Sequence, residues 1–166
     1  MVKRPKLTLI SGISGSGKTY LSRRIEVAEG AVRLSVDERM WERYGRFTDL
    51  PSEKQRELTL ATEADLREEA AELLRAGKDV VIDSCLCKRF KREAFKAVAE
   101  VCGAETECIY LTAPREELLA RLARRRGNDA NDIIVGEEDF ERFEKNFEIP
   151  GEDEDFRTID SLENKR

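Results

Sequence analysis

No part of this sequence narrows the possible folds more than a glycine-rich stretch near its beginning, which matches the pattern G-x-x-x-x-G-K-S/T without a gap. Its residues are Gly12, Ile13, Ser14, Gly15, Ser16, Gly17, Lys18 and Thr19. An apolar run precedes it and a helical pattern follows it. Glycines let the backbone curl around an anion with N–H groups pointing inward, and the positive end of the following helix attracts the same anion. The stretch predicts a phosphate-binding loop; a glycine-rich turn that only caps a helix is the alternative.

The last two residues of this stretch carry its side-chain chemistry. Lys18 supplies a positive charge to the β and γ phosphates of a nucleoside triphosphate, and Thr19 offers a hydroxyl to the magnesium ion that bridges them. We therefore predict ATP and Mg²⁺ as ligands. The guanine-reading sequence N-K-x-D of GTPases is absent from the chain.

Short apolar runs alternate with helix-length segments along the chain. We predict buried strands at residues 7–10, 31–36, 80–82, 108–111 and 156–159. We predict helices at residues 18–28, 52–76, 88–102, 114–126 and 137–147. This alternation is typical of a three-layer α/β/α fold, in which helices cover both faces of a parallel sheet. Ligands of such folds bind at the carboxyl ends of the strands.

Length and composition are those of one soluble domain. The chain has 166 residues, of which 40% are hydrophobic and 39% are charged, and we treat residues 1–166 as a single domain. Its formal net charge of -5 gives no overall positive field for nucleic acid or an anionic membrane. No apolar stretch is long enough to span a bilayer, and residues 1–6 lack a signal-peptide core. We expect a cytoplasmic protein that does not bind membranes; the charge argues against a nucleic-acid partner but leaves one open, since a local basic patch can still exist.

Cysteine and histidine usage narrows the chemistry further. The four cysteines are Cys85, Cys87, Cys102 and Cys108. They include no C-x-x-C pair, and the chain has no histidine that would complete a zinc site, so we expect buried free thiols. Without histidine, a general base must be a carboxylate or a less common group.

Two aspartates follow predicted strands and are the candidate acids. Asp37 comes directly after the strand at 31–36, on the same edge of the sheet as the phosphate-binding loop. There it can accept a proton from the phosphate acceptor, cap the next helix, or do both. Asp83 ends the strand at 80–82, in the position of a Walker-B acid that reaches magnesium through water; a strand-end turn is the alternative. Either aspartate has the position for a base. We assign that role to Asp37, and we assign Thr19 and Asp83 to the metal.

Arginines crowd the end of the helix predicted at 114–126. A mobile lid with arginines over the phosphates has this composition, although cations at a helix C-terminus also stabilise the helix dipole. The buried side of this helix is marked by Leu118, Leu119 and Leu122. Arg121, Arg125 and Arg126 lie off this buried side and are free to swing over a ligand. We predict a lid at about residues 121–140, with Arg126 on the phosphates and Arg121 and Arg125 contributing to nucleotide binding.

Two further clusters have an open interpretation. Three basic residues follow the third predicted strand: Lys88, Arg89 and Arg92. They either bind an anionic part of the substrate or form a solvated helix face. Three aromatic residues follow Asp37: Trp41, Tyr44 and Phe47. They either wall an acceptor pocket or belong to the core.

These residues resemble a known family, the small P-loop kinase-like ATP-binding proteins of the AAA_33 type, related to zeta toxins, chloramphenicol phosphotransferase and the 5'-kinase domain of polynucleotide kinase. The likeness runs along nearly the whole chain. Besides the phosphate-binding loop, it rests on residues 34–38, 40–41, 44–45, 80–83, 114–118, 125–127, 143–144 and 150–154. Only the loop is highly specific, and the other segments gain weight from their order and spacing.

The resemblance implies a sheet order of 2-3-1-4-5, a base at Asp37 and a phosphate-contacting lid arginine at Arg126. This chain departs from the polynucleotide kinases at one place. Those enzymes resemble it but have an arginine three residues after the base, where this chain has Met40, with Arg39 one position earlier. The departure argues against a nucleic-acid 5'-hydroxyl as the acceptor.

The expected function is an ATP-dependent kinase that transfers the γ-phosphate to a hydroxyl group of a small acceptor such as a sugar, nucleotide sugar or antibiotic. Two alternatives stay open. A polynucleotide 5'-hydroxyl kinase would have a basic groove and salt-dependent substrate binding. An ATP-binding regulatory or interaction protein would bind ATP without acceptor-stimulated phosphate transfer.

Overall fold

The computed structural model of the chain describes residues 2–163, and its centre is a five-stranded parallel sheet. The order β2-β3-β1-β4-β5 confirms the order that the resemblance implied. The strands are β1 (Lys6–Ser11), β2 (Val32–Ser35), β3 (Val80–Asp83), β4 (Glu105–Thr112) and β5 (Arg157–Asp160). The helices are α1 (Lys18–Glu29), α2 (Val36–Tyr44), α3 (Ser52–Arg75), α4 (Arg89–Val101), α5 (Arg115–Ala123) and α6 (Glu137–Asn146). Short 3₁₀ turns lie at η1 (Phe47–Asp49) and η2 (Glu152–Glu154).

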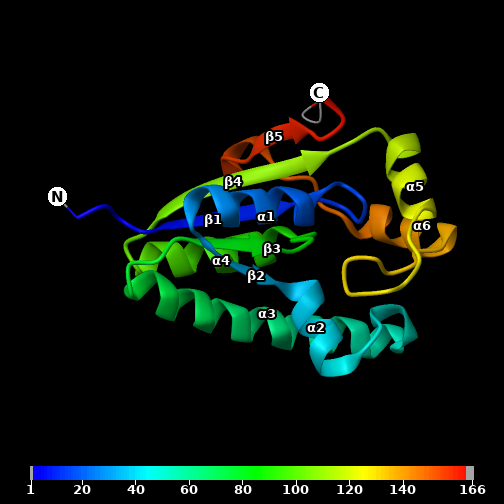
Figure 1. Cartoon of the computed structure of the whole chain (residues 1–166), viewed down its shortest axis with the longest axis horizontal. Coiled ribbons are helices and arrows are strands. Elements are labelled where there is room, and N and C mark those ends of the chain that lie inside the picture. The colour runs from blue at the N-terminus through cyan, green and yellow to red at the C-terminus, as the bar shows by residue number, and fades with distance from the viewer. Residues whose placement is uncertain (1, 164–166) are drawn as a thin grey trace.

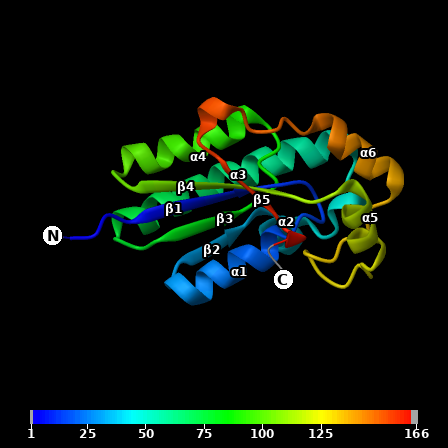
Figure 2. The ribbon, with the colours of Figure 1, turned by 90° about the horizontal axis from the view of Figure 1, so that it is seen from above.

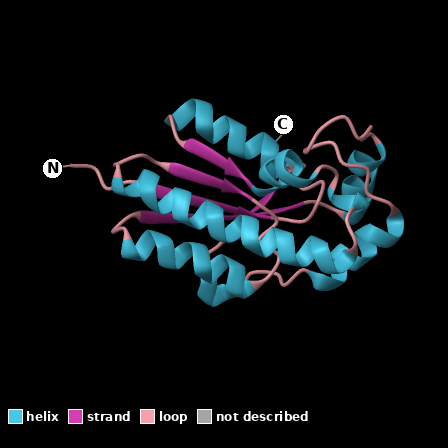
Figure 3. Ribbon diagram, turned by 90° about the horizontal axis from the view of Figure 1, so that it is seen from below, coloured by secondary structure: helices cyan, strands magenta, loops and turns pink. Residues whose placement is uncertain are grey.

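Helices cover both faces of the sheet, which confirms the predicted three-layer fold (Figures 1 and 2). On one face, Leu21 and Ile25 of α1 pack against a buried cluster that includes Val81. On the other, Leu66 of α3 and Phe95 of α4 are fully buried in the main core. Figure 3 shows the long helix α3 lying over one face of the sheet and running roughly along the strands. Within residues 2–163, no helix combines the length and apolar composition of a membrane span.

The register of the sheet gathers the candidate residues at one edge. Ile10 in β1 pairs with Asp83 in β3, and Ser35 at the end of β2 pairs with the same aspartate. The phosphate-binding loop follows β1 and α2 follows β2, so both begin beside Asp83. Figure 1 shows α5 and α6 beyond the same ends of the strands. The carboxyl edge of the sheet is therefore where a site can form.

The first turn of α2 carries Asp37, but Asp37 does not cap it. Ser35 is the N-cap, and its Oγ accepts a hydrogen bond of 3.2 Å from the backbone N–H of Glu38. The alternative in which Asp37 caps this helix is therefore wrong. Its carboxylate stays available for other chemistry.

The basic cluster at the start of α4 is used within the protein. Arg92 has a side chain that is 1% exposed, and its Nε and Nη2 donate to the Glu154 carboxylate at 2.7 and 3.0 Å. Its Nη1 donates to two backbone carbonyls, so the buried guanidinium is well satisfied. Lys88 and Arg89 also form ion pairs, with acidic side chains of the segment 148–153. These contacts favour a structural role for the cluster over a substrate-binding one.

Candidate functional site

The phosphate-binding loop turns sharply from β1 into α1, and two of its glycines are needed for that path. At Gly12 an added Cβ would lie 2.4 Å from Ser16 Oγ and 2.8 Å from Leu111 O. Gly17 is the N-cap of α1 with a φ of 99°, in the left-handed region that favours glycine. The Gly12 N–H donates to the carbonyl of Cys85 at 3.2 Å, which fixes the loop to the segment after β3. Only glycine suits both positions.

The N–H groups in the first turn of α1 lack a side-chain cap. No side-chain hydrogen bond caps this helix, and no acidic residue lies in its first turn. Uncapped N–H groups and the helix dipole together form an anion site. Lys18 is 8% exposed, and its Nζ donates to the Ile13 carbonyl at 3.2 Å, so its charge is held at the loop itself. Backbone and side chain thus both favour phosphate.

Asp83 lies at the tip of β3 and is held by two donors. The residue is 2% exposed, and its Oδ2 accepts from Arg33 Nη2 at 3.0 Å and from Ser22 Oγ at 3.1 Å. The position is the one expected of a Walker-B acid. Sequence reasoning missed Arg33, although a charged residue within an apolar strand is a signal that it has a buried partner.

Asp37 is surrounded by charges of both signs. The residue is exposed to solvent, yet enough protein surrounds its carboxyl for desolvation to raise its pKa. Lys18 and Arg125 lower this pKa, whereas Asp83 and Glu38 raise it. A solvent-accessible carboxyl with a raised pKa is a candidate for a general base.

The three lid arginines point in different directions. The Nη1 of Arg125 donates to Ser14 Oγ at 3.4 Å, so this guanidinium lies against the phosphate-binding loop. The Nη1 of Arg121 donates to the Gly15 carbonyl at 3.1 Å and supports the loop. Arg126 lies beyond the end of α5 and is exposed, and its Nη1 donates to the backbone carbonyls of Ala123 and Arg125. The structure therefore brings Arg121 and Arg125 to the loop, while the guanidinium of Arg126 points elsewhere.

The segment between α5 and α6, residues 124–136, contacts both the phosphate-binding loop and α2. Asn131 makes both contacts: its Oδ1 accepts from Thr19 Oγ1 at 3.3 Å, and its Nδ2 donates to Glu38 Oε1 at 3.0 Å. Sequence reasoning missed Asn131, because a single asparagine in a polar turn gives no distinctive signal. We call residues 124–136 the lid loop.

The oxygen ligands at this edge suit a magnesium ion. Thr19 offers a hydroxyl, and Asp83 offers a carboxylate, both hard ligands of the kind Mg²⁺ prefers. Among residues 2–163, no three or more His, Cys, Asp or Glu side chains are grouped to hold a metal ion. Magnesium in nucleotide sites commonly takes one or two protein oxygens together with phosphates and water. The donor set therefore fits an ion that arrives with the nucleotide.

Two cysteines lie beside the loop. All four cysteines are free, as expected, but only Cys108 is buried, so the expectation of burial is wrong for the other three. The thiols of Cys85 and Cys87 share a hydrogen bond. This bond raises the pKa of Cys85 and lowers that of Cys87, which also lies near Lys91 and Lys88. Cys87 is therefore the thiol with the most thiolate character.

We expect iodoacetamide to modify Cys87 much faster than Cys108 at neutral pH, because only the thiolate reacts. The bond from Cys85 and the charge of Lys91 hold the pKa of Cys87 below its ordinary value despite Glu63, whereas burial raises the pKa of Cys108 to about 11. Peptide mapping by mass spectrometry between about pH 5 and pH 10 measures both rates. Cys85→Ala is the control, since it should move the Cys87 profile to higher pH. Equal rates at the two thiols would contradict this assignment.

The aromatic residues after Asp37 have different environments. Phe47 packs against the main core, which supports the core interpretation for that residue. Trp41 is half-buried and Tyr44 is 37% exposed. Both lie on α2 with Asp37, and they stay candidates for contact with the phosphate acceptor.

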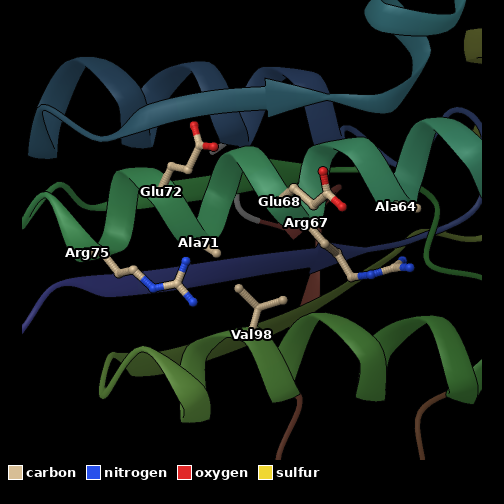
Figure 4. Close-up of a pocket in the computed structure, with 7 residues that line it drawn as sticks. All are labelled: Ala64, Arg67, Glu68, Ala71, Glu72, Arg75 and Val98. Atoms are coloured by element: carbon tan, nitrogen blue, oxygen red, sulfur yellow. The ribbon is translucent and has the colours of Figure 1, made fainter.

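A separate open groove of about 470 Å³ lies between α3 and α4. Its lining residues are Ala64, Arg67, Glu68, Ala71, Glu72, Arg75 and Val98. Figure 4 shows that all of them except Val98 come from α3. The groove shares no residue with the candidate site.

Comparison with models of known protein families gives one match for this chain. Residues 7–150 match the profile of AAA_33, described as an AAA domain. The chain belongs to this AAA domain family. The match covers the phosphate-binding loop, both candidate aspartates and the lid loop. No curated protein matches the sequence.

Solved structures similar to this AAA domain include several kinases. A sugar kinase from Janibacter sp. HTCC2649 is 18% identical with a TM-score of 0.67, over 94% of this chain and 85% of that chain. A gluconokinase from Sinorhizobium meliloti 1021 is 18% identical with a TM-score of 0.64, over 95% of this chain and 83% of that chain. The Mycobacterium tuberculosis APS kinase CysC, solved with AMPPNP and APS, is 21% identical with a TM-score of 0.57, over 73% of this chain and 70% of that chain. At these identities the likeness shows the fold, which is that of P-loop kinases.

Proposed function

We propose that this AAA domain is an ATP-dependent, magnesium-assisted phosphotransferase that moves the γ-phosphate of ATP to a hydroxyl group of a small molecule. One observation carries the proposal. The Asp37 carboxyl lies within electrostatic reach of both Lys18 of the phosphate-binding loop and Arg125 of the lid loop. A carboxylate there suits the removal of a proton from a hydroxyl as it attacks a phosphate held by those cations.

The phosphate side of the reaction depends on charge and position. The N–H groups of residues 12–19 would hold the phosphates, and Lys18 would neutralise charge on the β and γ groups. Arg125 would add a second positive charge from the lid loop, and Arg121 would keep the loop in shape through the Gly15 carbonyl. Arg126 would reach the phosphates only by turning away from the Ala123 carbonyl at the end of α5.

The metal side would use Thr19 and Asp83. A magnesium ion bound with ATP supplies Lewis-acid polarisation of the γ-phosphate. Thr19 Oγ1 now donates to the lid loop, and Asp83 Oδ2 is held by Arg33. Both side chains are thus fixed by hydrogen bonds at the edge of the sheet where the phosphates would lie.

A small hydroxyl compound is the acceptor class that the observations favour. Two of the similar structures are named as a sugar kinase and a gluconokinase. The polynucleotide alternative needs a basic groove, yet Arg39 is engaged with Glu69 at 2.9 Å and the chain has a net charge of -5. We therefore place polynucleotide 5'-kinase second.

A transfer assay with γ-labelled ATP tests the proposal. The acceptors are sugars, sugar acids, nucleosides, aminoglycosides, chloramphenicol and 5'-hydroxyl oligonucleotides. Magnesium-dependent transfer to a small hydroxyl compound supports the proposed function. Transfer to oligonucleotides alone would favour polynucleotide kinase. Binding of ATP with no transfer to any acceptor would favour a regulatory protein, and both of these results would overturn the proposal.

A further inference from the structure

Arg33 is a charged residue inside the apolar strand β2, and its side chain is only 8% exposed. Its donors reach three side chains: Nε donates to Ser22 Oγ at 2.8 Å, Nη1 to Glu38 Oε2 at 2.7 Å and Nη2 to Asp83 Oδ2 at 3.0 Å. Burying a guanidinium costs free energy unless its donors find partners. Here one buried cation holds two carboxylates at once.

The Glu38 carboxylate, which accepts from Arg33, also accepts a hydrogen bond from the lid loop. Its other oxygen, Oε1, accepts from Asn131 Nδ2 at 3.0 Å. Asn131 Oδ1 in turn accepts from Thr19 Oγ1 at 3.3 Å. A continuous chain of hydrogen bonds therefore runs from Asp83 through Arg33 and Glu38 to the lid loop, and from there back to the phosphate-binding loop.

We propose that Arg33 is a positioning residue that sets both the docking of the lid loop and the orientation of Asp83. The inference rests on the proposed function, in which Asp83 and Thr19 hold the metal ion of the nucleotide. Arg33 acts through Glu38 and Asp83 and contacts no substrate itself. Because Nη1 and Nη2 belong to one planar group, a movement of either carboxylate is transmitted to the other.

Arg23 provides a matched comparison within the chain. Its Nη2 lies 3.5 Å from Glu38 Oε1, but its side chain is 58% exposed. Solvent screens ion pairs of this kind, and they contribute little. If only a positive charge near Glu38 matters, removing either arginine should have the same effect. If the link between Glu38 and Asp83 matters, only the removal of Arg33 should have an effect.

Limited trypsin digestion of the nucleotide-free protein tests the docking of the lid loop. Trypsin cleaves after arginine, so cuts at residues 124–126 report opening of the lid loop, and cuts after the buried Arg92 report global unfolding. We expect Arg33→Met to accelerate cleavage of the lid loop about tenfold relative to cleavage after Arg92, the size expected for lost hydrogen bonds to charged groups. Arg23→Met should leave the ratio unchanged. If both cuts accelerate equally in Arg33→Met, Arg33 only stabilises the fold and the proposal is wrong.

A double-mutant cycle with Asn131 tests the coupling from its other end. Asn131→Ala removes the lid contact and leaves no buried charge, so this variant should fold normally and also raise cleavage of the lid loop about tenfold. The double variant should raise it no further. Effects that multiply to about a hundredfold would show that the two residues act independently and would overturn the proposal. Should Arg33→Met fail to fold, Glu38→Gln takes its place in the cycle.

Calorimetric titration with the non-hydrolysable analogue AMPPNP tests the orientation of Asp83. We expect Arg33→Met to lose most of the gain in affinity that Mg²⁺ gives, while it keeps the metal-free affinity. Arg23→Met should keep both. An equal loss with and without Mg²⁺ would overturn the role assigned toward Asp83. A wild-type protein that binds no AMPPNP would refute the proposed function instead, because the digestion tests Arg33 without any nucleotide.

Discussion

Replacing Lys18 by methionine is expected to lower kcat for phosphate transfer by roughly 10²- to 10³-fold and to weaken the binding of magnesium-ATP. The ammonium is held at the phosphate-binding loop by the Ile13 carbonyl at 3.2 Å, in a residue that is 8% exposed. Methionine keeps an unbranched side chain in this space and removes the charge that would face the β and γ phosphates. Single-turnover transfer from labelled ATP and titration with AMPPNP measure the two effects.

Lys88→Met is the matched control for this substitution. Lys88 is the N-cap of α4, and its Nζ lies 3.3 Å from a carboxylate oxygen of Glu148. We expect this variant to transfer phosphate at the wild-type rate, because its lysine already has a protein partner away from the loop. A folded Lys18→Met protein that binds AMPPNP with wild-type affinity would contradict the assignment of residues 12–19 as the triphosphate site.

Much of the fold could be predicted because its determinants are local in the sequence. The strand Val80–Asp83 is a short apolar run ending in an acid, and the phosphate-binding loop is one contiguous segment between a strand and a helix. Patterns of this kind predict elements and the edge where ligands bind. The strand order came from the family resemblance instead, because periodicity within a strand does not encode which strand lies beside it.

The helical phase did not predict the directions of the lid arginines, and the reason is geometric. The predicted helix extended to residue 126, and its helical phase placed Arg121, Arg125 and Arg126 toward a ligand. The helix α5 ends at Ala123, so this phase does not apply to the last two arginines. In the lid loop, Arg125 lies against the phosphate-binding loop while Arg126 faces the end of the helix.

The contacts that join the parts of the site could not be predicted from the sequence, for a different reason. Thr19 and Asn131 are 112 residues apart, and they meet only because the lid loop folds back over the edge of the sheet. Arg33 did give a signal, as a charge in an apolar strand, but its partner Asp83 follows from the adjacency of β2 and β3. Local sequence can show that a buried charge needs a partner, and only the topology shows which one it has.

Asparagine in place of Asp37 is expected to lower kcat by about 10²- to 10⁴-fold, with ATP affinity unchanged or higher. The amide keeps the size of the side chain but cannot take up the proton. Desolvation, Asp83 and Glu38 together raise the Asp37 pKa against the opposing charges of Lys18 and Arg125. A carboxylate with a raised pKa in the folded state opposes folding once it is ionised, so Asp37→Asn should be at least as stable as the wild type in urea at neutral pH. A loss of rate without a loss of stability separates lost chemistry from lost fold.

The pH dependence gives Asp37 a second, independent test. Because the carboxyl accepts a proton only when it is ionised, kcat/KM should fall as the pH drops through its raised pKa, beginning at a higher pH than for an ordinary aspartate. Asp37→Asn should lack this acidic limb. Glu42→Gln, on the same helix with a side chain that is 71% exposed, should keep both the wild-type rate and the limb. If Asp37→Asn transfers phosphate as fast as the wild type, the base is another group, and Asp83 at the same edge of the sheet is the next carboxylate to replace.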